Sequence, residues 1–302
     1  MRRAALILVL GLLAAGCGGS SSSGENGPIV LSGITPQQQS GLFLRQTNGT
    51  LRRLTGASDI RAVVPAFSHD GKRIAYVQLK RGLPGGTGRL MIMDADGGNA
   101  TQVGDVVAGA LQTAWSPDDS SLVYSDVRRG LWTIGADGKG AKRIFADVGE
   151  ASWSTDGRIV VARPPHELMT MNDDGSDVRE LPRPARPPKA LLPDSYSSPV
   201  WSPDGKRIAY VLKVWTPSKS FLFPTTMETV DSDGNDRQVV TTVFDSSGTT
   251  LTWSPDGELI AFTDLRDDQP GLWTIPPTGG PVKVLIEGTS RYSMPSWGPA
   301  GT

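Results

Sequence analysis

The sequence is poor in the side chains from which most metal sites and catalytic triads are built. Its 302 residues include one cysteine, Cys17, and two histidines, His69 and His166. One cysteine excludes an intrachain disulfide and a thiolate zinc cluster, and two isolated histidines disfavour a histidine metal site and a Ser-His-Asp triad. G-x-S-x-G, P-loop, G-x-G-x-x-G and H-E-x-x-H motifs are also absent. We therefore predict a protein that is not an enzyme and that holds no cofactor and no metal.

The sequence also lacks a large excess of charge of either sign. The 30 Lys and Arg residues balance the 31 Asp and Glu residues, so the formal net charge is −1. This balance argues against nucleic acid or an anionic membrane surface as a partner, because both attract proteins through bulk electrostatics. Glycine and proline, in contrast, are abundant, at 36 and 23 residues. Such a composition demands many tight turns and favours an all-β chain over a helical bundle.

The first residues have the pattern of a targeting signal. Arg2 and Arg3 precede a short apolar run that ends in L-L-A-A-G-C at Cys17. Small residues before a cysteine at the end of such a run resemble the lipobox of bacterial lipoproteins, which implies acylation of Cys17. The alternative is an ordinary cleavage site with an incidental cysteine. We predict a lipoprotein signal peptide at 1–16 and a flexible tether at 17–27, because G-G-S-S-S-S-G-E-N-G contains no apolar residue.

Two short strings repeat through the rest of the chain. Variants of W-S-P-D-G recur at spacings of 38 to 52 residues and begin at Phe67, Trp115, Trp153, Trp201, Trp253 and Trp297. Variants of L-W-T-I-x-A-D-G lie between them and begin at Leu90, Leu131, Leu168, Met227 and Leu272. Each repeat therefore holds four short strands, with Ser-Pro-Asp-Gly and Asp-Gly turns after the first and third strands. Four strands in a repeat of this length indicate a β-propeller blade.

The repeats add up to six blades. Five complete blades occupy about residues 60–286. The sixth takes its first strand from 292–297 and its other three from 29–32, 42–46 and 51–55. We predict an all-β, six-bladed propeller over 28–302, a monomer whose last blade is closed by the N-terminal strands and the C-terminal strand. Such closure removes exposed sheet edges.

Tryptophan marks the end of the first strand in five of the blades, at Trp115, Trp153, Trp201, Trp253 and Trp297. A large apolar side chain repeated at one position of every blade predicts packing between blades. A stacking platform for sugars or bases is the alternative.

These strings carry a resemblance to a known family. W-S-P-D-G-K-R-I-A-Y from Trp201 and L-W-T-I-G-A-D-G from Leu131 resemble the repeats of TolB-type six-bladed propellers, also called WD40-like or PD40 repeats. The resemblance extends over about residues 28–297 and implies a propeller of the bacterial cell envelope. The same repeats occur in envelope scaffolds, peptidase regulatory domains and some polysaccharide lyases. TolB itself has an α/β domain before its propeller, where this sequence has a ten-residue tether.

The long insertions all follow the second or fourth strand of a blade, so we expect them on one face of the ring. They are 80–89, 182–193 and 215–224. Variable loops on a rigid scaffold are typical of a binding face. We predict partner contacts from Trp215, Phe221, Phe223, Arg183, Arg186 and Lys189. The alternatives are that insertions accumulate wherever they are tolerated and that 221–223 packs inward as loop core.

The resulting hypothesis is a lipid-anchored extracytoplasmic propeller, in the periplasm or at the cell surface, that binds an envelope protein or peptide without catalysis. The membrane would be contacted through the N-terminal lipid only. Both chain ends should lie on the short-turn face, so the long-loop face would point away from the bilayer. The alternatives are a carbohydrate-active, polysaccharide lyase-like enzyme and a small-ligand sensor. A lyase needs metal ligands in the central channel, but small or apolar residues precede the strand-end aromatics, at Val64, Ala66, Ala114, Val200 and Leu251.

Overall fold

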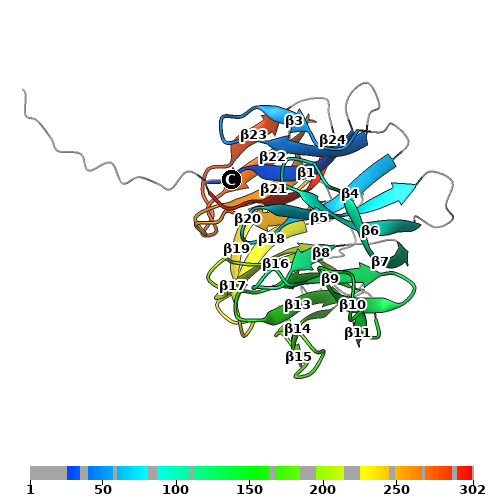
Figure 1. Ribbon diagram of the computed structural model, residues 1–302. Helices are drawn as coiled ribbons and strands as arrows, with labels where there is room; N and C mark the ends of the chain where they lie inside the picture. The colour runs from blue at the N-terminus through cyan, green and yellow to red at the C-terminus, as the bar shows by residue number, and fades with distance from the viewer. Residues whose placement is uncertain are drawn as a thin grey trace, which may run out of the picture.

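The chain forms a ring of six antiparallel sheets with four strands each (Figure 1). The computed structural model describes residues 26–34, 40–56, 60–80, 87–108, 112–147, 149–163, 167–183, 195–213, 225–244, 249–266, 269–287 and 291–300. Residues 1–25, which include Cys17 and the predicted signal peptide, lie outside the described residues. Within the described part, no helix is long and apolar enough to cross a membrane. The predicted all-β, six-bladed propeller is confirmed.

Blades 1 to 5 follow one another along the chain. Blade 1 consists of β4 (Ile60–Phe67), β5 (Arg73–Lys80), β6 (Thr87–Asp94) and β7 (Thr101–Ala108). Blade 2 consists of β8 (Thr113–Trp115), β9 (Ser121–Asp126), β10 (Gly130–Gly135) and β11 (Lys142–Phe145). Blade 3 consists of β12 (Glu150–Trp153), β13 (Arg158–Arg163), β14 (Glu167–Asn172) and β15 (Arg179–Glu180). Blade 4 consists of β16 (Ser195–Trp201), β17 (Arg207–Lys213), β18 (Thr225–Asp231) and β19 (Gln238–Thr242). Blade 5 consists of β20 (Leu251–Trp253), β21 (Ile260–Arg266), β22 (Gln269–Ile275) and β23 (Lys283–Glu287).

Blade 6 joins the two ends of the chain. Its strands are β24 (Arg291–Trp297), β1 (Ile29–Ile34), β2 (Ser40–Arg45) and β3 (Leu51–Arg53), in that order. The indole Nε1 of Trp297 donates to the carbonyl of Gly27 at 2.9 Å, and the Gly298 amide donates to the carbonyl of Pro28 at 2.8 Å. The C-terminal end accordingly lies beside β1 in Figure 1. The ring is thus closed by hydrogen bonds, as the sequence predicted.

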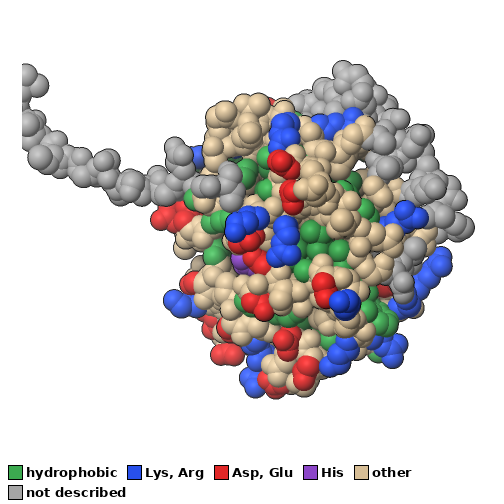
Figure 2. Space-filling view, in the orientation of Figure 1, with side chains coloured by type: hydrophobic (Ala, Val, Ile, Leu, Met, Phe, Trp, Pro, Cys, Tyr) green, Lys and Arg blue, Asp and Glu red, His purple; other side chains and the backbone are tan. Residues whose placement is uncertain are grey.

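The hydrophobic core is divided into six clusters, one in each seam between neighbouring blades. The second strand of each blade supplies both of its seams, because side chains alternate between the two faces of a strand. In β5, Ile74 and Tyr76 pack towards blade 6, whereas Ala75 and Val77 pack towards blade 2. The larger pair faces the preceding blade and the smaller pair the following one. Figure 2 shows acidic and basic side chains interspersed over the outside of the ring.

The Ser-Pro-Asp-Gly turns are held by one serine and one aspartate. In blade 4, the Ser202 hydroxyl donates to Asp204 at 2.6 Å and accepts the Arg207 amide at 2.9 Å, while Gly205 takes a φ of 69°. In blade 2, hydrogen bonds from Ser116 and Ser120 lower the pKa of Asp118 to about 2. A carboxyl group whose pKa is lower in the folded state than in the unfolded state stabilises the fold at pH values above its unfolded pKa. This contribution is lost as the pH falls towards the folded pKa. The Asp118 turn therefore keeps its hydrogen bonds until about pH 2.

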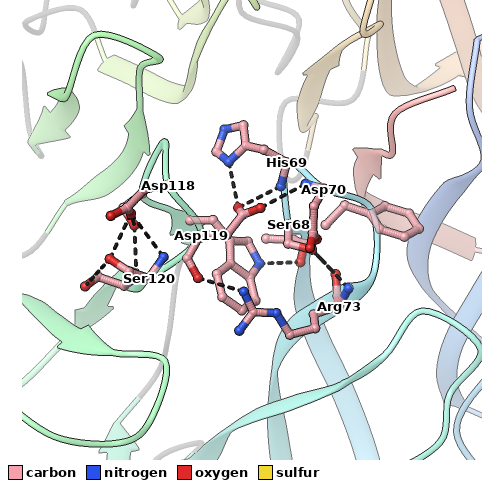
Figure 3. Close-up of polar contacts among 12 residues, drawn as sticks. Ser68, His69, Asp70, Arg73, Asp118, Asp119 and Ser120 are labelled. Carbon is pink, nitrogen blue, oxygen red and sulfur yellow. Dashed lines mark hydrogen bonds and ion pairs between the residues drawn. The ribbon is translucent and has the colours of Figure 1, made fainter.

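Blade 2 departs from the repeat where Asp119 replaces the turn glycine. Asp119 takes a φ of 56°, and its carboxylate accepts the backbone amides of His69 and Asp70, both at 2.8 Å, from the turn of blade 1 (Figure 3). The His69 imidazole Nδ1 lies 2.9 Å from the same carboxylate, and Arg73 donates to the Asp119 carbonyl at 2.7 Å. One substitution in the repeat thus links two neighbouring turns.

We expect Asp119→Gly to destabilise the protein by about 1–2 kcal/mol, although glycine suits the positive φ better. The loss of charge-assisted hydrogen bonds to two backbone amides destabilises the fold by more than the relief of left-handed backbone strain stabilises it. The control is Asn99→Gly, since Asn99 has a φ of 50° and is exposed. Asn99→Gly should alter the free energy of unfolding by no more than about 0.5 kcal/mol. Urea denaturation measures both, and equal effects would contradict a stabilising contact between the turns.

Deleting residues 291–302 removes β24 and should lower the melting temperature by more than about 10 °C. The deletion removes Trp297 from its seam and exposes the edge of β1, and a loss of 1 kcal/mol corresponds to about 2–4 °C for a protein of this size. Deleting residues 301–302 alone is the control. Calorimetry that gave the same melting temperature for the two deletions would refute closure by both chain ends.

Candidate functional site

The first strands of the six blades surround a cavity on the ring axis, with a volume of about 890 Å³. We call β4, β8, β12, β16, β20 and β24 the inner strands. His69, Thr155 and Pro203 line the cavity at the short-turn end, and Gln112, Glu150 and Lys213 line it at the opposite end, the channel mouth. Fourteen serine and threonine residues line the cavity, whereas Glu150 is the one carboxylate among the described lining residues. The volume lies within the range of about 300–1,000 Å³ that is usual for ligand pockets.

The aromatic residues at the ends of the inner strands face the preceding blade rather than the cavity centre. Trp115 donates from Nε1 to the carbonyl of Ala66 at 3.0 Å, and Trp253 donates to the carbonyl of Val200 at 3.2 Å. Both side chains are buried. The prediction that these tryptophans pack between blades is confirmed.

The residue before each aromatic faces the following blade. Hydroxyl groups at this position accept the backbone amide of the next strand-end aromatic in three seams. The pairs are Ser152 with Trp201 at 3.4 Å, Thr252 with Trp297 at 3.2 Å and Ser296 with Phe67 at 2.9 Å. These bonds fix the spacing of the inner strands around the channel.

Three inner strands carry a β-bulge at a residue followed by proline. Val64, Ser198 and Met294 have φ values of 48°, 52° and 55°, and the strand register shifts at each of them. Proline cannot donate to a strand ladder, which explains a bulge at this place. A positive φ is costly for residues other than glycine, most of all for a β-branched residue such as Val64, and such strain gathers at functional sites.

Two of the bulges direct a backbone amide to the preceding blade. The Met294 amide donates to the hydroxyl of Thr250 at 2.7 Å, and the Ser198 amide donates to the carboxylate of Glu150. Burial raises the pKa of Glu150, and the hydrogen bonds from Ser198 oppose that rise. The bulges therefore add hydrogen bonds between blades at the level of the channel mouth.

The sequence analysis missed Glu150 and Gln112. Both stand three residues before the strand-end tryptophan of their blade, at the position that Val64, Ser198, Thr250 and Met294 occupy in the other blades. Aligning the repeats at this offset would have shown that the mouth is more polar than expected.

Of the predicted contact residues, only Arg183 belongs to the described part of the chain. Its guanidinium is half exposed and donates to Glu180 at 2.6 and 2.8 Å. The others, Trp215, Phe221, Phe223, Arg186 and Lys189, lie outside the described residues. The strands on either side of 214–224 end and begin at Lys213 and Thr225, and both residues line the cavity.

The charged side chains do not gather into a metal site. No group of three His, Cys, Asp or Glu residues within the described ranges could hold a metal ion. His69 lies at the short-turn end beside Asp119, and His166 is outside the described residues. In the turns after two third strands, the carboxylates of Asp94, Asp96 and Asp231 accept hydrogen bonds from the turn itself.

Comparisons with known proteins identify the fold. No family model matches the chain. An uncharacterised peptidase, YuxL of Bacillus subtilis, is 24% identical over 152 residues, which are 50% of this chain and 22% of that protein. The chain thus spans about a fifth of the length of this relative. TolB from Acinetobacter baumannii superposes with a TM-score of 0.72 at 19% identity, over 90% of this chain and 67% of that one. An oligogalacturonate lyase in complex with manganese superposes with a TM-score of 0.57 at 16% identity, over 86% of this chain and 74% of that one. The chain therefore has the six-bladed propeller fold found in TolB, as the repeats indicated.

Proposed function

We propose that this chain is a lipid-anchored extracytoplasmic propeller that binds an envelope protein or peptide, without catalysis, at the channel mouth. The observation that carries the proposal is an open cavity on the ring axis that fourteen serine and threonine residues line. The fold shared with TolB supports a binding scaffold outside the cytoplasm.

The lining of the cavity suits a peptide segment. An extended peptide presents one N–H donor and one C=O acceptor per residue, apart from proline. Serine and threonine hydroxyls both donate and accept, so the fourteen that line the cavity can serve either group. The strand-end aromatics are engaged between blades and leave the polar groups to contact the partner.

The position of Gly27, near the start of the described chain, orients the proposed binding face. Gly27 lies against Gly298 and Pro299, which follow the inner strand of blade 6 at the short-turn face. A ten-residue tether has a root-mean-square span of about 17–19 Å. A lipid on Cys17 would hold the short-turn face near the bilayer and direct the channel mouth away from it.

The anchor is tested by Cys17→Ala. The protein should then leave the membrane fraction or remain unprocessed, because an acyl chain and not the balanced protein surface provides membrane affinity. Fractionation together with mass spectrometry of the mature N-terminus measures this. An unmodified mature N-terminus at another residue would overturn the anchor and leave the channel proposal standing.

Partner binding is tested by narrowing the channel mouth. Ser195 lines the mouth on β16 and is half-buried. We expect Ser195→Trp to reduce partner capture in a cross-linking pull-down from native envelopes at least tenfold. Thr101→Trp, on the exposed edge strand β7, should capture as the unchanged protein does. Both variants are first checked for an unchanged melting temperature.

Capture that is equal for the two variants would contradict binding at the mouth. The fold shared with a manganese-bound lyase, together with Glu150 and Gln112 in the channel, makes a polysaccharide lyase the second candidate. Turnover of polyuronides that requires a divalent metal and is lost in Ser195→Trp would favour the lyase and refute a non-catalytic role.

A further inference from the structure

One seam of the ring differs from the other five at the level of the inner strands. In five seams at least one hydrogen bond joins neighbouring inner strands. No such bond joins β8 of blade 2 to β12 of blade 3 among the residues that the structure describes. Ala114 offers no hydroxyl where Ser152, Thr252 and Ser296 do, and the Trp153 indole donates to Gly157 of its own blade instead of to blade 2.

Gln112 is the polar residue that this seam leaves unpartnered. It holds the same position as Glu150 and Thr250, each of which accepts the amide of a bulged residue in the following blade. The inner strand of blade 3 has no bulge, so the Glu150 amide belongs to the β12–β13 ladder. The side-chain oxygen of Gln112 is buried and has no hydrogen-bond partner in the described part of the chain. A buried acceptor without a donor is destabilising, and a donor on a ligand would remove that penalty.

Glu150 occupies the same position on the neighbouring inner strand and also lines the cavity. Its carboxylate receives hydrogen bonds from Ser198, and no basic side chain of the described residues forms an ion pair with it. A carboxylate that is largely removed from water and has no cation beside it is costly, and burial raises the pKa of Glu150 accordingly.

We propose that Gln112 and Glu150 form a subsite for a basic side chain, the ammonium of a lysine or the guanidinium of an arginine, on the peptide segment that enters the channel mouth. This inference rests on the proposed function. Both cations are pure donors, and they match an amide oxygen that lacks a donor and a carboxylate that lacks a cation. A metal ion fits less well, because the described residues offer no third His, Cys, Asp or Glu close enough to complete its ligands.

The test measures binding of small capped amino acids to the detergent-solubilised full-length protein by titration calorimetry or NMR. The probes are Nα-acetyl-lysine N-methylamide, its Nε-acetylated form and Nα-acetyl-norleucine N-methylamide. We expect the lysine probe to bind at least tenfold more tightly than the two neutral probes. Glu150→Gln should abolish this preference while keeping an acceptor for the Ser198 amide, and Gln112→Ala should reduce it at least threefold. Glu258→Gln removes an exposed carboxylate from a turn of blade 5 and should leave the preference unchanged.

Several results would overturn the subsite. Equal binding of the three probes, no binding of any probe up to about 10 mM, or a lysine preference that survives Glu150→Gln would each do so. These outcomes are separable from failure of the proposed function. If partner capture is lost in Ser195→Trp but unchanged in Glu150→Gln, the partner binds at the channel mouth and the basic subsite is wrong. An arginine probe, Nα-acetyl-arginine N-methylamide, identifies which of the two cations the subsite prefers.

Discussion

Everything in this molecule depends on the contact between neighbouring blades. A single four-stranded blade has two apolar faces and cannot bury either one alone, so the fold exists only when all six seams are filled. Side chains alternate between the two faces of the second strand, so this strand contributes to both seams of its blade. In β5, Ile74 and Tyr76 pack into one seam, and Ala75 and Val77 pack into the other. Closure of blade 6 by β24 and β1 completes the sixth seam and makes stability a property of the whole ring.

The channel is a consequence of how the seams are joined at their inner edge. The strand-end aromatics lie between blades, so the residues before them define the wall and carry its polarity. The bulges at Val64, Ser198 and Met294 break the repeat at this level, and the amides of Ser198 and Met294 donate to the preceding blade. The strain that a positive φ introduces is thus balanced in part by hydrogen bonds that shape the channel mouth.

The repeats made the fold predictable, because turn chemistry and strand alternation recur in register along the chain. Blade number, the split of blade 6 and the burial of the tryptophans all followed from them. The site was less predictable, because it consists of departures from the repeat. Asp119 in place of a turn glycine, Ala114 in place of a hydroxyl and the prolines after Val64, Ser198 and Met294 are visible in the sequence. Their effect depends on which residue of another blade lies opposite, and a single sequence does not show that. The bond from the Ser198 amide to the Glu150 carboxylate, for example, joins residues that are 48 positions apart.

The central claim is that the bulged residues hold neighbouring blades together through their backbone amides. Amide hydrogen exchange of Ser198 and Met294, measured by NMR, tests it most directly. We predict protection comparable to that of amides inside the strand ladders, since both groups are bonded to the preceding blade. Glu150→Ala should speed exchange at Ser198 and leave Met294 unchanged. Exchange of both amides as fast as at Asp236, which has a positive φ in an exposed turn, would contradict the account.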